Sequence, residues 1–415
     1  MLIYIDRYNW SCKQFTLSAQ LSAQNNINIK FMNSFTGYLR QNGKVGIRND
    51  LLILNLTGLT NKVAERIHQN INYSKLISFE YGMGLLNKDK EISQNVLIGL
   101  SLNPNVGGVL LISSDQSRSE IVVEQLKKNK KPFRNIFLGD VGSDPLEMII
   151  TAVKEGAEIL KEISEIKKNQ FRLDKVCLSV ECGLSDPTSG LFANPLIGKI
   201  SDKIVESGGI VIVGETLEWL GVENDLAKRA VSSDVRKQIE KCVLRREKLA
   251  IDNGINLSGI NPNKKNIEDG LSTIEEKAIG SSIKSGSSKI EGVLEYGEIP
   301  KNSGLWLMDA PSYTPESLTG FSSAGSQICL FSTGSGNCYS SDLMPTLRIT
   351  ANPETASRLR HQIDHDCSDL ITNGNFEKAE NNLLEDLVSV LSGKLCYGEI
   401  LGDGGETISR FGEAL

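Results

Sequence analysis

The sequence lacks the features that mark membrane, secreted and nucleic-acid-binding proteins. Its longest apolar runs, such as residues 208–214, have the length of a β-strand and fall far short of a bilayer span. The N-terminal segment is mixed and polar, without the apolar core of a signal peptide. There is no dense block of lysine or arginine, and the net charge is −6. We therefore expect neither a membrane nor a nucleic acid among the partners.

Residues that typically bind metals are also sparse. The 8 cysteines are scattered without C-x-x-C spacing, which indicates neither a disulfide framework nor a zinc ribbon. Among the 3 histidines, His361 and His365 fit one face of a helix. No glutamate-bearing metalloprotease pattern accompanies them, so a solvated helix face is the better interpretation. These observations predict a cytoplasmic protein with free thiols.

An alternation of short apolar strands with amphipathic helices organises the chain. Its 415 residues are too many for one typical core, and this alternation is typical of parallel sheets covered on both faces. We predict an α/β fold of two Rossmann-like parallel-sheet domains with a shared cleft. Residues 1–36 would form an N-terminal arm, 37–170 the first domain, and 171–415 the second domain, with a long inserted loop at 252–270. A charged linker near residues 165–175 would join the domains.

The expected strands are residues 51–56, 76–81, 108–113, 136–139, 176–180, 209–213, 304–308, 327–332 and 347–350. The expected helices are residues 61–71, 91–100, 116–128, 145–168, a helix after 194, 226–251 and 382–391.

The loop after the strand at 176–180 concentrates reactive groups. It holds the thiol of Cys182, the hydroxyl of Ser185, the carboxylate of Asp186 and the amide of Asn194. In an open α/β sheet, ligands bind at the carboxyl ends of the strands. An ordinary strand-to-helix connection is the alternative, because a turn needs only the glycines and the proline. A free cysteine is also more often a small core residue than a ligand.

Glu215 and Glu218 follow the next strand. A semi-buried carboxylate at this position can act as a base or bind a metal. The alternatives are a helix N-cap for Glu215 and a helix-dipole contact for Glu218. Because consecutive parallel strands are commonly neighbours, we expect both glutamates to lie near the Cys182 loop.

Seven motifs occur in an order that resembles a known family: residues 37–49 (GYLRQNGKVGIRN), 103–110 (NPNVGGVL), 181–195, 214–218 (GETLE), 308–311 (MDAP), 318–320 (LTG) and 333–336 (TGSG). Together they are similar to the altronate dehydratase/galactarate dehydratase family of sugar-acid hydro-lyases, which includes the large subunit of sulfolactate sulfo-lyase. The resemblance covers about residues 37–400.

The chain departs from the family pattern in its first domain. The family usually has cysteine or histidine where this chain has Leu59, Phe79 and Met83, and a Gly-Cys-Glu where it has Ser113, Ser114 and Asp115. Thiolate and imidazole are soft metal ligands. We therefore expect Leu59, Phe79 and Met83 to lie close together, to seal the pocket, and to leave the first domain without a metal.

The resemblance implies a hydro-lyase that converts a sugar acid, such as altronate or galactarate, to a 2-keto-3-deoxy acid. The alternatives are a catalytically silent paralogue that binds a sugar acid or supports an active partner, and a sulfo-lyase-type large subunit. We expect catalysis by Glu215, Glu218, Asp186 and Ser185, and contact of any Fe or Mn with Cys182 or Asp186. A separate small subunit and a homodimer are also expected. The expected substrate-binding residues are Asn61, Asn194, Asp309, Thr319, Thr333, Gly334 and Gly336.

Overall fold

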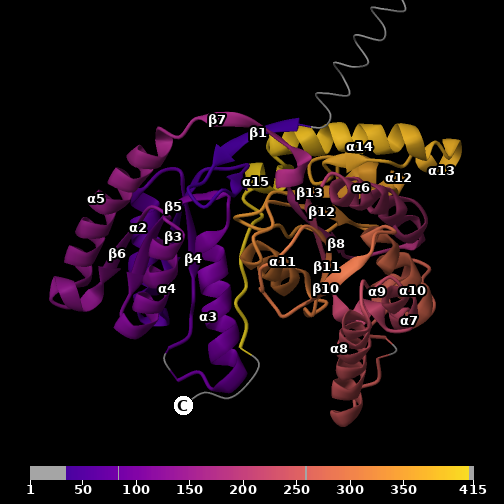
Figure 1. Ribbon diagram of the computed structural model, residues 1–415, viewed down its shortest axis with the longest axis horizontal. Helices are drawn as coiled ribbons and strands as arrows, with labels where there is room; N and C mark the ends of the chain where they lie inside the picture. Colours follow the sequence, from indigo (N-terminus) through magenta and orange to yellow (C-terminus); the bar gives the residue numbers. More distant parts are fainter. Residues whose placement is uncertain (1–33, 83, 258, 411–415) are drawn as a thin grey trace, which may run out of the picture.

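The computed structural model describes residues 34–82, 84–257 and 259–410 and consists of two α/β halves (Figure 1). The first half contains a parallel four-stranded sheet in the order β4-β3-β5-β6. Its elements are β3 (Asp50–Asn55), α2 (Asn61–Asn70), β4 (Ser74–Ser78), α3 (Asn87–Leu102), β5 (Val106–Ser113), α4 (Gln116–Lys128), β6 (Phe133–Phe137) and α5 (Pro145–Ser164).

The central strand β3 is apolar on both faces because helices cover both. Leu52 and Leu54 belong to the core beneath α3 and α4, whereas Leu51 and Ile53 pack with α2 and α5. A strand covered on both sides reads as a continuous apolar run, as the sequence of β3 does. The predicted α/β class is therefore confirmed for this half.

The second half contains a parallel seven-stranded sheet in the order β10-β11-β9-β8-β12-β13-β14. Its strands are β8 (Cys177–Cys182), β9 (Ile210–Val213), β10 (Ile290–Leu294), β11 (Gly304–Met308), β12 (Ile328–Ser332), β13 (Thr346–Thr350) and β14 (His365–Asp366). Its helices are α6 (Asn194–Glu206), α7 (Glu223–Lys228), α8 (Ser233–Asp252), α9 (Lys264–Glu268), α10 (Ile274–Ser282), α11 (Thr314–Ser323), α12 (Pro353–Arg358), α13 (Leu370–Asn373), α14 (Phe376–Leu391) and α15 (Tyr397–Leu401).

One hydrophobic core joins the two halves. On β9, Val211 and Val213 face the core formed with α6 and α14, while Ile212 points to the opposite face. That opposite core contains Phe321 of α11 together with Leu52 and Leu54 of the first sheet. The predicted fold with two parallel sheets is confirmed. A cavity of about 450 Å³ lies at the joint, between α3 and residues 295–299.

The two asparagines of the 103–110 motif hold the halves together. Asn103 Nδ2 donates to the carbonyls of Ser322 (2.8 Å) and Ser326 (3.0 Å). Asn105 Nδ2 donates to the carbonyls of Gln327 (2.9 Å) and Leu343 (2.8 Å). Both asparagines are fully buried, so the motif serves the joint between the halves.

The segment that joins the halves contains a strand and is not simply a linker. Strand β7 (Lys168–Arg172) pairs antiparallel with β1 (Ser34–Leu39), which also pairs with β2 (Val45–Gly46). This small sheet lies above both halves in Figure 1. Of the predicted arm at residues 1–36, residues 1–33 lie outside the described residues, and residues 34–36 belong to β1.

Several predicted elements differ from the structure. The helix expected at 226–251 is interrupted between α7 and α8, where Val231 N donates to the carbonyl of Ile290 (3.1 Å). His361 and His365 do not share a helix, because His365 lies in β14. His365 is buried, and its Nδ1 lies 2.9 Å from Asp386 Oδ2, which contradicts the solvated face for this residue.

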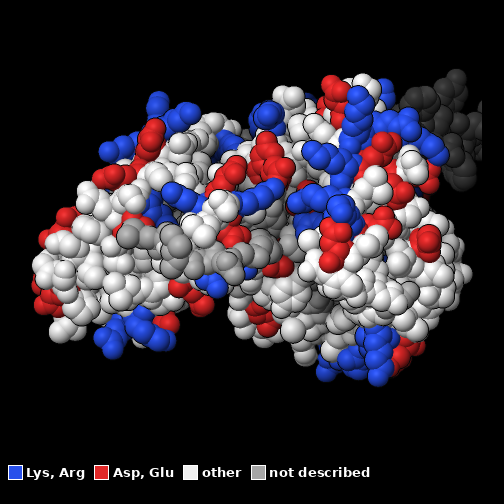
Figure 2. Space-filling model, turned by 90° about the horizontal axis from the view of Figure 1, so that it is seen from below, with Lys and Arg blue, Asp and Glu red and all other residues white. Residues whose placement is uncertain are grey.

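The surface carries charges of both signs. In Figure 2, basic and acidic side chains are interspersed over the visible face of both halves, without a field of one sign. No helix among the described residues combines the length and the apolar character that a membrane crossing requires.

Candidate active site

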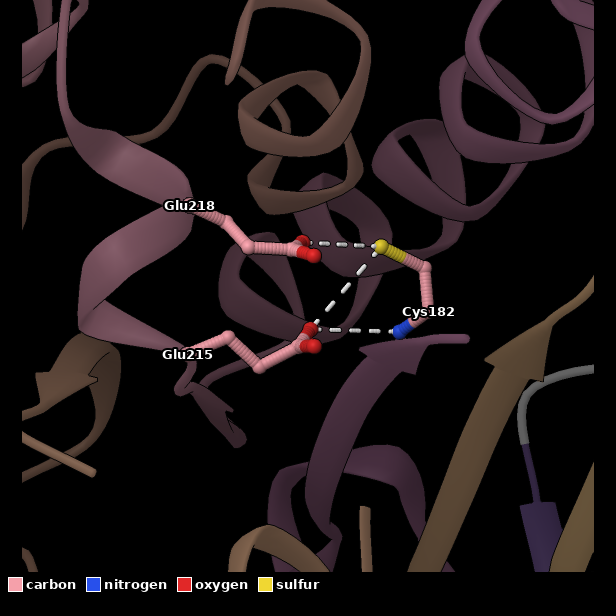
Figure 3. A group of neighbouring side chains, drawn as sticks. All are labelled: Cys182, Glu215 and Glu218. Carbon is pink, nitrogen blue, oxygen red and sulfur yellow. Dashed lines mark hydrogen bonds between the residues drawn. The ribbon is translucent and has the colours of Figure 1, made fainter. Parts of the chain in front are cut away.

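Two neighbouring strands, β8 and β9, bring a thiol and two carboxylates together (Figure 3). Cys182 is the last residue of β8, and Glu215 lies just after β9. Glu215 has a φ of 67°, in the left-handed region that non-glycine residues rarely adopt. The turn then enters the short helix η5 (Thr216–Trp219), which carries Glu218. Such strain is maintained only where the surroundings determine it, and it clusters at functional sites.

The three side chains form a compact buried group. Cys182 Sγ lies 3.2 Å from Glu218 Oε2 and 3.8 Å from Glu215 Oε2. The backbone N–H of Cys182 also donates to Glu215 Oε2 (3.3 Å). The ligand atoms of all three lie within 4.8 Å of one another, the spacing of a group that can hold a metal ion. Glu215 makes no side-chain cap to η5, so the capping alternative does not apply to it.

Two lysines and a serine that the sequence analysis did not identify complete this cluster. Lys284 Nζ donates to Glu215 Oε2 (2.6 Å), Cys182 Sγ (2.9 Å) and Ser281 Oγ (3.0 Å). Lys277 Nζ lies 2.8 Å from Glu218 Oε1, and Ser281 Oγ donates to Glu218 Oε2 (2.5 Å). We call these six residues, Cys182, Glu215, Glu218, Lys277, Ser281 and Lys284, the ionic cluster.

A sequence signal for these missed residues exists. Lys277, Ser281 and Lys284 are spaced by four and three residues, which places them on one face of a helix. In the structure, α10 and the following 3₁₀ turn (Ile283–Ser285) carry them. Two cations on the inward face of a short helix indicate buried acidic partners.

The electrostatics of the cluster separate its two carboxylates. Burial alone would raise the pKa of Glu218, but Lys277 and Lys284 lower it to about 2. Burial, followed by the charge of Glu218, raises the pKa of Glu215. Burial acts to lower the pKa of Lys284, but the adjoining Cys182, Glu215 and Glu218 raise it well above its ordinary value. Glu218 is thus a fixed anion, whereas Glu215 is the carboxylate suited to exchanging a proton.

Glu181 lies next to the cluster, on the other side of β8. Its Oε2 accepts a hydrogen bond from Ser317 Oγ (2.8 Å), while its buried Oε1 has no partner among the described residues. Burial, and then the charge of Glu215, raise the pKa of Glu181 well above its ordinary value. Glu181 is therefore a second buried carboxyl that holds its proton more tightly than an ordinary glutamate.

A cavity of about 370 Å³ adjoins the cluster. Lys277 and Ser281 line it from α10, and Ser185 lines it from the loop after β8. Ser185 Oγ is buried without a hydrogen-bond partner in the described part of the chain. The cavity rim is apolar, with Leu191 and Ile279 exposed. A polar ligand in this cavity would meet the ammonium of Lys277, the hydroxyls of Ser185 and Ser281, and the carboxylates of Asp186 and Glu276.

Asp186 and Asn194 line the same cavity, but their polar groups are engaged in the loop. Asp186 Oδ1 accepts from Ser189 N (2.9 Å), and Oδ2 accepts from Asn352 Nδ2 (2.8 Å). Asn194 is bonded to the carbonyl of Gly280 (2.8 Å) and to Ser332 Oγ. The structure places Asp186 outside the group of possible metal ligands found among the described residues.

The other predicted binding residues of the second half lie in separate networks. Asp309 is paired with Arg245 and Arg246 of α8, the latter at 3.1 Å, and accepts from Thr216 Oγ1 (2.9 Å). Thr319 Oγ1 accepts from the N–H of Thr407 (2.8 Å), in the C-terminal segment. That segment, residues 402–410, runs between the halves in Figure 1.

The 333–336 loop supports the turn that holds Asp186. A side chain at Gly334 would place its Cβ 2.3 Å from the Asp186 carboxyl carbon, so only glycine fits this contact. Gly336 has a φ of 100°, and its N–H donates to Thr333 Oγ1 (3.0 Å). These three predicted residues therefore shape the loop in the structure.

The corresponding edge of the first sheet contains no acid–lysine cluster in its described residues. The predicted residue Asn61 accepts from Asn55 Nδ2 (2.5 Å). Arg118 donates to the carbonyls of Leu56 (2.9 Å) and Gly82 (2.8 Å), and its guanidinium lies 4.8 Å from the centre of the Phe79 ring.

The predicted apolar seal at this edge is wrong for Leu59. This residue is 79% exposed, while Phe79 is buried. Met83, the third residue of the expected trio, lies outside the described residues. An exposed leucine cannot close a pocket, and the closing contact at this edge is made by Arg118 instead.

The structure thus consists of two parallel α/β sheets, with a buried thiol, carboxylates and lysines beside a cavity at the carboxyl edge of the second. The family model described as D-galactarate/altronate dehydratase, C-terminal, matches residues 173–413. The model of the second domain of D-galactarate dehydratase/altronate hydrolase matches residues 37–164. The chain belongs to the D-galactarate/altronate dehydratase family.

Comparison with curated relatives supports the same family. The chain is 33% identical over 385 residues to the β subunit of (2R)-sulfolactate sulfo-lyase from Chromohalobacter salexigens, covering 92% of this chain and 98% of that subunit. It is 29% identical to altronate dehydratase from Bacillus subtilis, over 88% of this chain and 75% of that enzyme. The identity to altronate dehydratase from Escherichia coli is 30%, over 85% and 72% respectively.

Proposed function

We propose that the chain is the large subunit of a lyase that removes a substituent from carbon 3 of a 2-hydroxy acid. The first candidate reaction is dehydration of a sugar acid, such as altronate or galactarate, to a 2-keto-3-deoxy acid. The observation that carries this proposal is the contact between cavity and cluster: Lys277 and Ser281 line the cavity and also bind Glu218. The family and its dehydratase members support the same reaction class.

The reaction needs a base for the proton on carbon 2, a positive charge for the resulting enediolate, and an acid for the departing hydroxyl. Lys277, on the cavity wall, supplies the charge. Glu215 is the proposed base, because its raised pKa favours proton uptake. It is connected to the cavity through Lys284 Nζ and Ser281 Oγ, which are 3.0 Å apart. The C–H bond at carbon 2 breaks and its proton passes by way of Ser281 and Lys284 to Glu215. The C–O bond at carbon 3 then breaks as the same proton returns to the hydroxyl, so that water leaves and the enol formed becomes the 2-keto acid.

A divalent metal such as iron or manganese fits this cluster only with a rearrangement. Cys182, Glu215 and Glu218 would hold it, and it would supply charge stabilisation. However, the ammonium of Lys284 lies among the three ligand atoms, 2.6 Å from Glu215 and 2.9 Å from Cys182. The residues as they stand do not fit a metal, and none of the proposed steps uses one.

A sulfo-lyase is the second candidate, and the similarity to the sulfo-lyase β subunit favours it. The chain is 33% identical to that subunit over 98% of the subunit's length. Sulfolactate is also a 2-hydroxy acid with a leaving group on carbon 3, so both candidates begin with the same proton abstraction. The name of the relative implies a second subunit, and we propose a separate small subunit as partner, within a homodimer of this chain. The free cysteines of the described residues support a cytoplasmic location.

The test is a substrate panel with the chain alone and with a candidate small subunit. Hexonates, hexarates and (2R)-sulfolactate are supplied, and the 2-keto acid and sulfite are measured. We expect a keto acid from at least one substrate, with sulfite appearing only if the second candidate is right. Glu215→Gln keeps the size of the side chain and removes the base, so we expect a loss of at least about 100-fold in kcat.

The matched control is Glu385→Gln, an exposed glutamate on α14, which should retain the parent rate. A Glu215→Gln variant as fast as the parent would exclude Glu215 as the base. If the parent leaves every acid untouched with the small subunit, iron and manganese all supplied, the silent-paralogue alternative replaces the lyase.

A further inference from the structure

The ammonium of Lys284 occupies the position between Cys182, Glu215 and Glu218 that a bound cation would take. Its Nζ lies 2.6 Å from Glu215 Oε2, 2.9 Å from Cys182 Sγ and 3.6 Å from Glu218 Oε2. Figure 3 shows the three side chains converging on one another. A transition metal would need the same three atoms at about 2.0–2.3 Å.

Lys284 is held in this position by its backbone. Its carbonyl accepts from Ser201 Oγ (2.9 Å) on α6, and the next residue, Ser285, accepts from Arg229 (2.8 Å). Gly198 of α6 lies against the same turn, where a Cβ would come 2.4 Å from the carbonyl of Ile283. The side chain is fully buried, so its ammonium is shielded from solvent.

The charge balance inside the cluster favours one cation at this position. With Lys284 present, two carboxylates are balanced by two ammonium groups, and a divalent ion would add uncompensated charge to the interior. With Lys284 removed, a divalent ion would deprotonate Cys182. Two carboxylates and one thiolate would then balance the metal and Lys277, so the interior would again be neutral.

We propose that Lys284 is the resident cation of the ionic cluster: it replaces a metal between Cys182, Glu215 and Glu218, and its removal creates a site for a thiophilic divalent cation. Lys284 is thus a positioning residue that holds the two glutamates and the thiol in place. This proposal concerns the occupancy of the cluster and does not require that the chain be an enzyme.

Cobalt(II) is a suitable probe because a bound thiolate gives it a charge-transfer absorption. Chelator-treated parent protein and Lys284→Ala are titrated with Co²⁺ under reducing conditions. We expect no thiolate–cobalt band from the parent and a band that saturates near one equivalent in Lys284→Ala. The melting temperature of Lys284→Ala should rise with Co²⁺, while that of the parent stays unchanged, because an ion that binds only the folded state stabilises it.

The Lys284→Ala/Cys182→Ser double variant shows which thiol gives the band. It lacks Cys182 but keeps the exposed Cys338, so a band from Cys338 would persist in it. Its failure to show the band supports the proposal, and a band that persists overturns it. If Lys284→Ala is unfolded without metal, it is refolded with Co²⁺, and recovery of a cobalt-loaded fold also supports the proposal. A thiolate–cobalt band in the parent, or no cobalt binding by Lys284→Ala under either protocol, overturns it.

Discussion

Both sheets place a cation at the carboxyl edge of their strands, yet the two cations have different partners. In the first half, Arg118 binds the carbonyl oxygens of Leu56 and Gly82. In the second half, Lys284 binds the carboxylate of Glu215 and the thiol of Cys182. The same architecture therefore yields a hydrogen-bonded tie between loops at one edge and a compact ionic cluster at the other. What differs is how closely the acids of the loops approach the cation: Arg118 Nε lies 3.9 Å from the carboxylate of Asp115, whereas Lys284 Nζ lies 2.6 Å from that of Glu215.

The largest expected effect comes from removing the buried cation. Lys284→Met retains most of the side-chain volume but leaves Glu215 buried without its charged partner. Breaking a buried ion pair in this way costs about 3–5 kcal/mol of unfolding free energy. Denaturant unfolding measures the change. Lys228→Met is the matched control, because its pair with Asp225 is exposed at 70% and 74% and should contribute at most about 1 kcal/mol.

If Lys284→Met were no more destabilising than Lys228→Met, the charge of Lys284 would not stabilise the cluster, and the contrast drawn between the two edges would fail.

A pH dependence is expected from Glu406, in the segment between the two halves. Its Oε2 is buried without a partner among the described residues, although Oε1 accepts from Ser341 and Ser322. Burial raises the pKa of Glu406 from 4.5 to about 7. The folded state therefore binds this proton more tightly, and the associated stability is complete below pH about 4.5 and lost as the pH rises through about 7.

The loss amounts to at most about 3.5 kcal/mol, at about 1.4 kcal/mol per pH unit. Glu406→Gln should flatten this part of the stability curve in unfolding experiments between pH 4.5 and pH 7. The contribution of Glu218 has the opposite sign. Because the folded state lowers the pKa of Glu218 to about 2, the stability that this carboxylate contributes is present above the ordinary pKa of a glutamate and is lost as the pH falls toward about 2. A parent curve that rises between pH 4.5 and pH 7, and to the same extent in Glu406→Gln, would contradict the assignment.

A smaller loss of stability is expected at the carboxyl edge of the first sheet. Arg118→Met removes the hydrogen bonds to the loop carbonyls and the contact with the Phe79 ring. We expect a loss of about 1.5–3 kcal/mol, the range for hydrogen bonds to charged groups. Hydrogen exchange around Gly82 should accelerate before global unfolding does. Arg236→Met, on the exposed face of α8, is the control and should change stability little; equal effects of the two variants would show that Arg118 holds no loop.

The smallest effect is expected at Leu59. Because 79% of this residue is exposed, Leu59→Ser should change the unfolding free energy by no more than about 0.5 kcal/mol. Thermal unfolding can measure this. A loss of several kcal/mol would restore the original prediction that Leu59 seals an apolar pocket.

The regular parts of the fold could be predicted from the sequence. The helix expected at residues 116–128 corresponds to α4, and the strand expected at 304–308 corresponds to β11. The helix begins after the capping residue Asp115, and the strand is a short continuous apolar run with clear ends. The helix at 226–251 was predicted without its interruption, because the break depends on a hydrogen bond between Val231 and the distant residue Ile290. Strand β7 was missed for a similar reason, since its partner β1 is far away in the sequence.

The sequence by itself determined that a thiol and two acids lie at the ends of β8 and β9, because strand ends follow from the local pattern. This was enough to predict that Cys182, Glu215 and Glu218 belong to one site. Only the tertiary structure decided which side chains contact them. Lys284 lies 102 residues after Cys182, and it reaches the cluster only because α6 and the turn Ile283–Ser285 pack beside β8. Tertiary structure likewise engaged Asp186 and Asn194 in the loop, since their partners come from distant segments. Local sequence fixes where polar groups emerge from a strand, but the partner that neutralises a buried charge is selected by packing.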